Sequence, residues 1–267
     1  NNLIKYFKSF TQELYEFITF NSDLEHKLEK LIIKSGLKVS KENKRFISNL
    51  EVPDEPYVNF RKMFSPNCSK LDPIFKYLYQ IKDTDESILL LGETGVGKEV
   101  LANLIHNESN RKNVTNGFQP FNCASVSKEL IEAKLFGHEK WAFTDAKEMR
   151  EGLFELAHRG TLFLDEIGDA TPEVQTALLK VLENKKIRRV GGRKDIVVDV
   201  RVIFATNQNL ENLVSEGKFR KDLYYRIKKH TINIPPLKKR LEDIPYIVDL
   251  RKAEYEKTYN TKLDISE

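Results

Sequence analysis

Cysteine is scarce in this sequence, which has only Cys68 and Cys123 among its 267 residues. Two cysteines do not provide the disulfide framework of a small secreted domain, so we expect the reducing cytoplasm. Long apolar runs are also missing, since none approaches the roughly 18 residues that a transmembrane helix requires, and we expect no membrane contact. Neither sign of charge dominates, because 44 Lys and Arg face 40 Asp and Glu. This weak balance does not by itself indicate a nucleic-acid partner.

The composition is that of a globular protein, with 40% hydrophobic and 31% charged residues. The length suits one large domain or two modest ones. The chain begins with Asn1 rather than methionine and carries no apolar signal stretch, so we expect a fragment of a longer protein.

The first 35 residues carry an apolar seven-residue spacing, at Leu3, Phe10, Phe17, Leu24 and Leu31. This spacing is typical of an amphipathic helix with a seam of the coiled-coil type. Two interpretations remain open: a pair of helices packed on a core, or a dimerising and signalling helix. The aromatic rings between Tyr6 and Phe20 favour the packed pair.

Changes in composition along the sequence divide the chain into three parts. Residues 38–54 are polar and charged and precede Pro56, which predicts a linker that closes a helical N-terminal segment at residues 1–54. Residues 55–236 form the core, and residues 237–267 begin a further helical part.

Short apolar runs alternate with helical patterns along the core. The runs cover residues 88–91, 118–121, 161–164, 198–204 and 231–234. Helices are expected at residues 71–78, after Lys98, around Leu130 and Leu153, from Pro172, around Leu223 and from Leu237. Continuous apolar strands that alternate with helices indicate an α/β fold, with a parallel five-stranded sheet between helices.

A glycine-rich turn follows the first of these runs and opens a helix. It reads Gly92, Glu93, Thr94, Gly95, Val96, Gly97, Lys98. This is a P-loop pattern, in which backbone N–H groups surround phosphate oxygens and Lys98 reaches the β- and γ-phosphates. Glu99 occupies the position where most P-loops carry Ser or Thr.

Two further polar groups follow apolar strands. Asp165 and Glu166 come directly after residues 161–164, and Asn207 follows the run that ends near Phe204. A carboxylate at a strand end can hold Mg²⁺, and the next one can polarise the attacking water. Asn207 could orient that water, although asparagine at a strand end is also a common turn former.

Residues 88–248 resemble the AAA+ ATPase domain of sigma-54-dependent transcription activators, the bacterial enhancer-binding proteins. The blocks that carry this resemblance are residues 92–99, 121–124, 135–139, 160–169, 188–192, 219–226 and 235–237. The resemblance implies a P-loop AAA+ fold with a helical lid, of which residues 237–267 are only the beginning. It places the second sensor arginine and a DNA-binding module beyond Glu267.

The resemblance also implies roles. Asp165 would hold Mg²⁺ beside ATP, Glu166 would activate water, and Asn122 would be the switch that restrains Glu166. Asn207 would be the first sensor. Arg220 and Arg226 would reach the nucleotide of an adjacent subunit, in a ring that typically has six members.

One segment departs from the family pattern. The loop that grips the sigma factor reads Gly-Ala-Phe-Thr-Gly-Ala in the family, and here it is Trp141, Ala142, Phe143, Thr144, Asp145, Ala146. Both glycines are replaced, and tryptophan disfavours the positive φ that glycine permits. An exposed tryptophan on a loop also indicates a contact surface.

Three functions remain as hypotheses. The leading one is a ring-forming ATPase that remodels sigma-54 RNA polymerase and activates transcription. The second is the same ATPase acting on another partner, as in a stress or defence sensor, and the third is a nucleotide-gated binding module with little hydrolysis. The basic run at residues 185–194 could touch DNA or form a solvated hairpin, and the sequence leaves this open.

Overall fold

The computed structural model describes residues 57–65, 68–143, 146–259 and 262. The apolar N-terminal spacing, the expected linker at residues 38–54, and Thr144 and Asp145 of the loop lie outside the described residues. The chain divides into two compact units, Asn1–Val58 and Asn59–Glu267. The second unit contains the sheet and the P-loop, and the description below concerns this unit.

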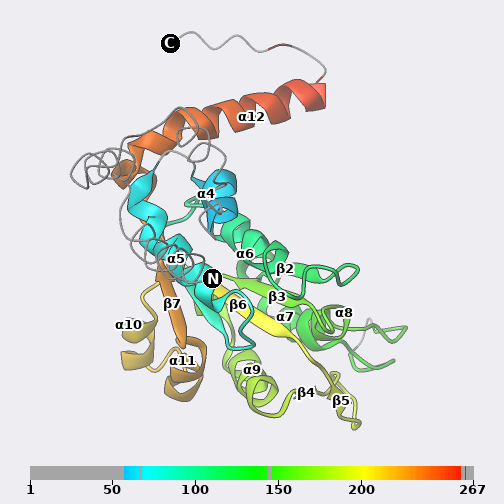
Figure 1. The fold of residues 1–267 in the computed structure, drawn as a ribbon. Helices are drawn as coiled ribbons and strands as arrows, with labels where there is room; N and C mark the ends of the chain where they lie inside the picture. Colours follow the sequence, from blue (N-terminus) through cyan, green and yellow to red (C-terminus); the bar gives the residue numbers. More distant parts are fainter. Residues whose placement is uncertain (1–56, 66–67, 144–145, 260–261, 263–267) are drawn as a thin grey trace, which may run out of the picture. The chain divides into compact units, whose positions relative to one another are not determined.

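Five parallel strands form the central sheet, in the order β2-β3-β6-β1-β7 (Figure 1). The strands are β1 (Ile88–Leu91), β2 (Phe118–Asn122), β3 (Thr161–Asp165), β6 (Arg201–Thr206) and β7 (His230–Asn233). The predicted α/β fold with a parallel five-stranded sheet is therefore confirmed. The inner strands are the most apolar, because helices cover both of their faces.

Helices lie on both faces of this sheet, whereas α12 extends away from it (Figure 1). The helices of the described residues are α4 (Val58–Phe64), α5 (Asp72–Ile81), α6 (Lys98–Asn107), α7 (Lys128–Phe136), α8 (Leu153–Leu156), α9 (Pro172–Asn184), α10 (Leu210–Ser215), α11 (Lys221–Ile227) and α12 (Ile244–Tyr259). The residues at the N-terminus of α9 explain why this helix begins there. Pro172 occupies its first turn, and Thr171 Oγ1 accepts a hydrogen bond from Val174 N–H. None of the helices in the described part of the chain is long and apolar enough to cross a membrane.

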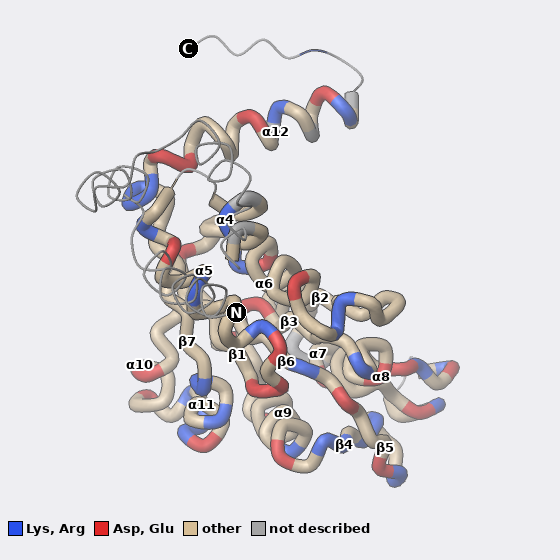
Figure 2. Tube along the Cα trace, viewed as in Figure 1, with Lys and Arg blue, Asp and Glu red and all other residues tan. Residues whose placement is uncertain are grey.

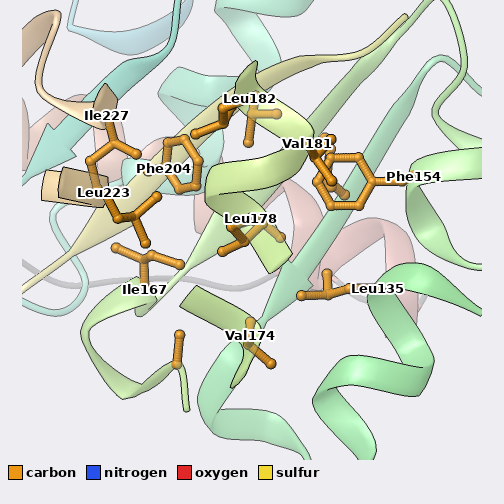
Figure 3. Packing of buried hydrophobic residues seen from close by; sticks show 14 of the residues in the cluster. Leu135, Phe154, Ile167, Val174, Leu178, Val181, Leu182, Phe204, Leu223 and Ile227 are labelled. Carbon is orange, nitrogen blue, oxygen red and sulfur yellow. The ribbon is translucent and has the colours of Figure 1, made fainter. Parts of the chain in front are cut away.

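The main core lies between one face of the sheet and helices α7, α8, α9 and α11. Figure 3 shows side chains of α9, among them Leu178 and Val181, beside Phe204 of β6 and Phe154 of α8. Phe204, Phe154 and Leu178 are fully buried. On the opposite face α6 packs against β2 and β3, and His106 Nδ1 lies 3.0 Å from Thr161 Oγ1.

Two predicted boundaries are wrong. The strand expected at residues 198–204 begins only at Arg201, because Val198 N–H donates to Lys185 O and Asp199 N–H donates to His158 Nδ1. The helix expected from Leu237 starts at Ile244, after the short 3₁₀ turns η4 (Leu237–Lys239) and η5 (Leu241–Asp243). Pro245 is tolerated only in a first helical turn, so an α-helix continuous from Leu237 is excluded.

The basic run forms a small hairpin of β4 (Lys186–Ile187) and β5 (Ile196–Val197). Arg188 pairs with Asp195 at 2.7 Å. Arg189 pairs with Glu155 at 2.6 Å and with Glu139 at 3.3 Å. Figure 2 shows basic and acidic segments side by side in this region. The two arginines are thus paired with carboxylates of their own chain, and the choice between a solvated hairpin and a DNA contact remains a prediction.

Truncation of Phe204 tests the core. We expect Phe204→Ala to lower the free energy of unfolding by about 3–5 kcal/mol, because it leaves a cavity where the surrounding atoms collapse only in part. Val197→Ala, at a side chain that is 65% exposed, should change it by less than about 0.5 kcal/mol. Urea unfolding of both variants measures the difference, and equal effects would contradict this description of the core.

Candidate functional site

The glycine-rich turn connects β1 to α6 at the carboxyl edge of the sheet. Gly95 has φ +82° and Gly97 has φ +97°, a backbone conformation that side chains with a Cβ disfavour. Gly97 is also the residue that caps the start of α6. The turn therefore has the P-loop conformation that the sequence predicts, with a helix N-terminus behind it.

Lys98 lies at the centre of the site. Its side chain is only 5% exposed, and its ammonium donates to Gly92 O at 3.1 Å. The same Nζ atom lies 3.7 Å from Glu166 Oε1. A buried cation is thus held among the loop carbonyls and one carboxylate, within reach of a ligand seated in the loop.

Glu166 has a left-handed backbone, with φ 50° and ψ 49°. For a residue other than glycine this conformation costs about 1–2 kcal/mol. The resulting turn directs the carboxylate toward β6, where Glu166 Oε2 accepts hydrogen bonds from Asn207 N–H at 3.2 Å and Thr206 Oγ1 at 3.5 Å. Backbone strain of this kind concentrates at functional sites.

Asn207 links the carboxylate to the P-loop. Its side-chain Nδ2 donates to Thr94 Oγ1 at 2.9 Å, while its backbone N–H binds Glu166. Three segments that lie far apart in the sequence therefore meet: the loop with Thr94 and Lys98, the end of β3, and the end of β6. The structure brings these predicted residues together.

Asn122 lies beside this cluster but has a different partner. It stands opposite Asp165 in the register of β2 and β3. Its Oδ1 accepts from Ala124 N–H at 2.8 Å and caps the 3₁₀ turn η2 (Cys123–Ser125). Among the hydrogen bonds of the described residues, none joins Asn122 to Glu166, so the switch contact implied by the resemblance remains a prediction.

Arg220 and Arg226 lie apart from the P-loop of their own chain. Arg220 forms two hydrogen bonds with the carboxylate of Asp222, at 3.0 and 2.7 Å, and its side chain is 44% exposed. This pairing raises the pKa of Arg220. Arg220 also lines an open hollow of about 490 Å³ with Lys221, Asp222 and Tyr225. Arg226 donates to Leu182 O at 3.0 Å.

The donors near the loop limit how a metal could be held. Asp165 ends β3 next to Glu166, and its Oδ1 accepts from Glu166 N–H at 3.0 Å. Glu99 is exposed on the first turn of α6. In the described part of the chain, no group of three or more His, Cys, Asp or Glu side chains could hold a metal. This sparse oxygen set fits Mg²⁺, which takes one or two carboxylates together with substrate phosphates and water.

The altered loop keeps a turn geometry in spite of its tryptophan. Trp141 has φ 65° and is 68% exposed. Its N–H donates to Ala146 O at 2.7 Å, and Ala146 N–H donates to Phe143 O at 2.9 Å. Phe143 packs edge-on against His138, with ring centroids 4.9 Å apart. The exposed tryptophan predicted from the sequence is therefore present.

The base of this loop is fixed by a partly buried arginine whose role the sequence interpretation missed. Arg189 of the hairpin donates to both carboxylate oxygens of Glu155, at 2.8 and 2.6 Å, and these bonds raise its pKa. It also donates to Glu139, just before the loop, at 3.3 Å. The run of basic residues concealed this role, because ion pairs between distant segments leave no periodic pattern in the sequence.

A second group of residues, which the sequence analysis did not identify, packs on the outer side of the P-loop. A Cβ atom on Gly97 would lie 2.9 Å from the ring of Phe64, so this ring packs directly on the loop. Arg240 donates to Val96 O at 2.6 Å. Lys238 lies nearby and pairs with Glu93 at 3.1 Å, but both side chains are largely exposed, so this pair contributes little to the loop. The family motif at residues 235–237 lies next to this region in the sequence, but the motif does not include Arg240.

A parallel five-stranded sheet, a P-loop after β1, an acidic pair after β3 and a polar residue after β6 define an AAA+ ATPase domain. The chain belongs to the sigma-54 interaction domain family, whose sequence pattern matches residues 65–233. The family resemblance and the ATPase class predicted from the motifs are therefore confirmed.

Known relatives share this domain. The chain is 51% identical over 179 residues to the Nif-specific regulatory protein of Herbaspirillum seropedicae. This aligned segment covers 67% of this chain and 33% of that protein. It is 49% identical over 175 residues to the DNA-binding transcriptional regulator NtrC of Salmonella typhimurium, covering 66% and 37%. The crystal structure of NtrX from Brucella abortus in complex with ATP has a TM-score of 0.66 and 35% identity, covering 73% and 42%. The chain thus spans about a third of the length of these curated relatives.

Cys123 provides a test of the packing behind the acidic pair. Burial, reinforced by Asp169, Asp165 and Glu166, raises the pKa of its thiol to about 12. At pH 8 only about one thiol in 10⁴ is then ionised, and the thiolate is the reactive form. We expect iodoacetamide to leave Cys123 unmodified in the folded chain and to label it in urea, as read by peptide mass spectrometry. Rapid labelling at pH 8 without urea would contradict this burial.

Proposed function

We propose that this domain binds ATP with Mg²⁺ in the P-loop, hydrolyses it within a ring of subunits, and uses the energy to remodel sigma-54 RNA polymerase. The observation that carries the hydrolysis is the position of Glu166, which is 3.7 Å from Lys98 and bonded to the backbone of Asn207. A general base held beside the phosphate-binding lysine is what the attack of water on a γ-phosphate needs. The reducing cytoplasm expected from the two cysteines remains a prediction.

Each residue has a role in this proposal. The N–H groups of the glycine-rich turn bind phosphate oxygens, and Lys98 neutralises the β- and γ-phosphates. Glu166 accepts a proton from the attacking water, and Asn207 orients that water or the γ-phosphate. Asp165 would hold Mg²⁺, which supplies charge neutralisation when it is bound. Asn122 would restrain Glu166 in another nucleotide state.

The ring follows from the arginines. Arg220 and Arg226 form no contact with the P-loop of their own chain in the described part, while Arg220 is exposed beside an open hollow. A planar guanidinium that reaches a neighbour's nucleotide can accelerate phosphoryl transfer by about 10³–10⁵. We therefore propose that Arg220 and Arg226 complete the site of an adjacent subunit, in a ring to which the family resemblance gives six members.

Glu166→Gln tests the hydrolysis. We expect the steady-state ATPase rate to fall by about 10²-fold or more, because the amide cannot accept the proton, while ATP still binds. Glu216→Gln is the matched control, since Glu216 is an exposed carboxylate that pairs with Lys218 at 2.7 Å. It should keep the wild-type rate.

The same assay separates the hypotheses. A rate per subunit that rises with protein concentration would support sites shared in a ring, and a constant rate would contradict them. A negligible rate in the wild type, with ATP bound, would favour the nucleotide-gated binding module.

A second candidate is the same ATPase acting on a partner other than sigma-54. The observation that favours it is Trp141, which exposes 68% of its surface at the position of the first glycine of the family's loop. An exposed aromatic ring on a contact loop is a frequent anchor of a protein interface. Such a ring changes the surface presented to the partner without changing the nucleotide site.

Restoring the glycines separates the two candidates. If sigma-54 is the partner, the wild type should be captured with RNA polymerase holoenzyme in the presence of a transition-state nucleotide analogue. If another partner is served, the wild type should not be captured, and the double substitution Trp141→Gly with Asp145→Gly should gain binding. A pull-down quantified by immunoblot measures both, and an unchanged absence of capture in the double variant would count against the second candidate.

A further inference from the structure

Arg240 forms a buried contact with the P-loop that the chemistry above does not use. The residue lies between η4 and η5 and is only 3% exposed. Its guanidinium donates to Val96 O at 2.6 Å across 144 positions of sequence. It also stacks over the ring of Phe64, with 5.3 Å between the guanidinium carbon and the ring centroid.

Arg240 is in turn joined to the start of α12. Asp243 Oδ2 accepts from Arg240 at 3.3 Å, and Asp243 is fully buried directly before Ile244, the first residue of that helix. Asp243 Oδ1 accepts a short hydrogen bond from Ser65, which is also fully buried. The arginine therefore stands between the phosphate-binding turn and the first turn of α12.

The position of the contacted carbonyl gives the contact a function. Val96 lies between two glycines with positive φ, and glycine restricts the orientation of the adjoining Val96–Gly97 peptide less than a residue with a Cβ would. In a trans peptide the C=O and the next N–H point in opposite directions. A guanidinium that holds Val96 O on the outer side thus aims the N–H of Gly97 toward the inner side, where P-loop amides meet phosphate.

We propose that Arg240 is a positioning residue, which orients the Gly97 amide for phosphate and makes that orientation depend on the position of α12. The proposal rests on the binding of ATP in the loop that is part of the proposed function. Because coupling between two sites is reciprocal, a bound nucleotide must also stabilise the contact between Arg240 and the start of α12. The nucleotide is thereby sensed through the backbone of the loop.

A second link between the same two segments provides a control. Lys238 and Glu93 pair at 3.1 Å, but their side chains are 71% and 62% exposed. Exposed pairs of this kind contribute little. Arg201 is a second control, because it is buried like Arg240 but binds the carbonyls of Ile81 and Lys82 at the opposite end of β6.

The experiment compares full-length variants by equilibrium binding of ADP and by ATPase kinetics. We expect Arg240→Gln to raise the Kd for ADP and the KM for ATP by about tenfold or more, with kcat within about threefold. Lys238→Gln should leave both constants unchanged. Arg201→Gln should lower the melting temperature and leave the Kd of the folded protein unchanged.

Hydrogen exchange of residues 244–248 reads the coupling directly. Saturating ADP should slow exchange there in the wild type and not in Arg240→Gln. Asp243→Asn keeps the shape of the side chain and the contact of Arg240 with Val96, so it should retain most of the affinity and lose this protection. It also carries the test if Arg240→Gln does not fold.

Wild-type affinity in a folded Arg240→Gln, or wild-type protection in Asp243→Asn, would overturn the proposal. A wild-type chain that binds no nucleotide would overturn the proposed function as well. Loss of turnover in Glu166→Gln bears on hydrolysis alone, because the binding assay here needs no turnover.

Discussion

Leu91 of β1 lies opposite Thr206 of β6, and Leu164 of β3 lies opposite Phe204, so three parallel strands end at one edge of the sheet. Everything in the site depends on this register. A shift of one residue in β3 would turn Glu166 away from β6 and separate it from Lys98, because strand side chains alternate between faces. The apolar core on both faces fixes the register, and the polar strand ends follow from it.

The site stores strain that the rest of the domain offsets. Glu166 is held in a left-handed turn, and Lys98 is buried among carbonyls with a carboxylate nearby. Both features cost stability when they are considered alone. They persist because the hydrogen bonds from Asn207 and Thr206 fix the carboxylate, and because the carbonyls of Gly92 and Glu93 accept hydrogen bonds from the ammonium.

Local signals predicted most of the sheet and the centre of the site. The strand at residues 88–91 was predicted with its observed bounds, and the P-loop, Glu166 and Asn207 were identified because each follows an apolar run. Pro245 was a local signal for the start of α12, but the contacts of Arg240 could not be predicted in the same way. They depend on a carbonyl 144 positions away and on a buried carboxylate, and such contacts leave no period in the sequence.

The altered loop separates what the fold requires from what a partner requires. Trp141 keeps the positive φ that glycine would adopt at no cost, at a penalty of about 1–2 kcal/mol. The hydrogen bond from its N–H to Ala146 O and the ion pairs of Arg189 at the base hold the turn closed. The penalty brings no burial in return, since the ring is 68% exposed. Within the chain the ring is contacted by the ammonium of Lys140, 5.3 Å from its centroid, and most of its surface is left exposed. A strained, exposed aromatic residue at this position supports the proposal that the loop contacts a partner.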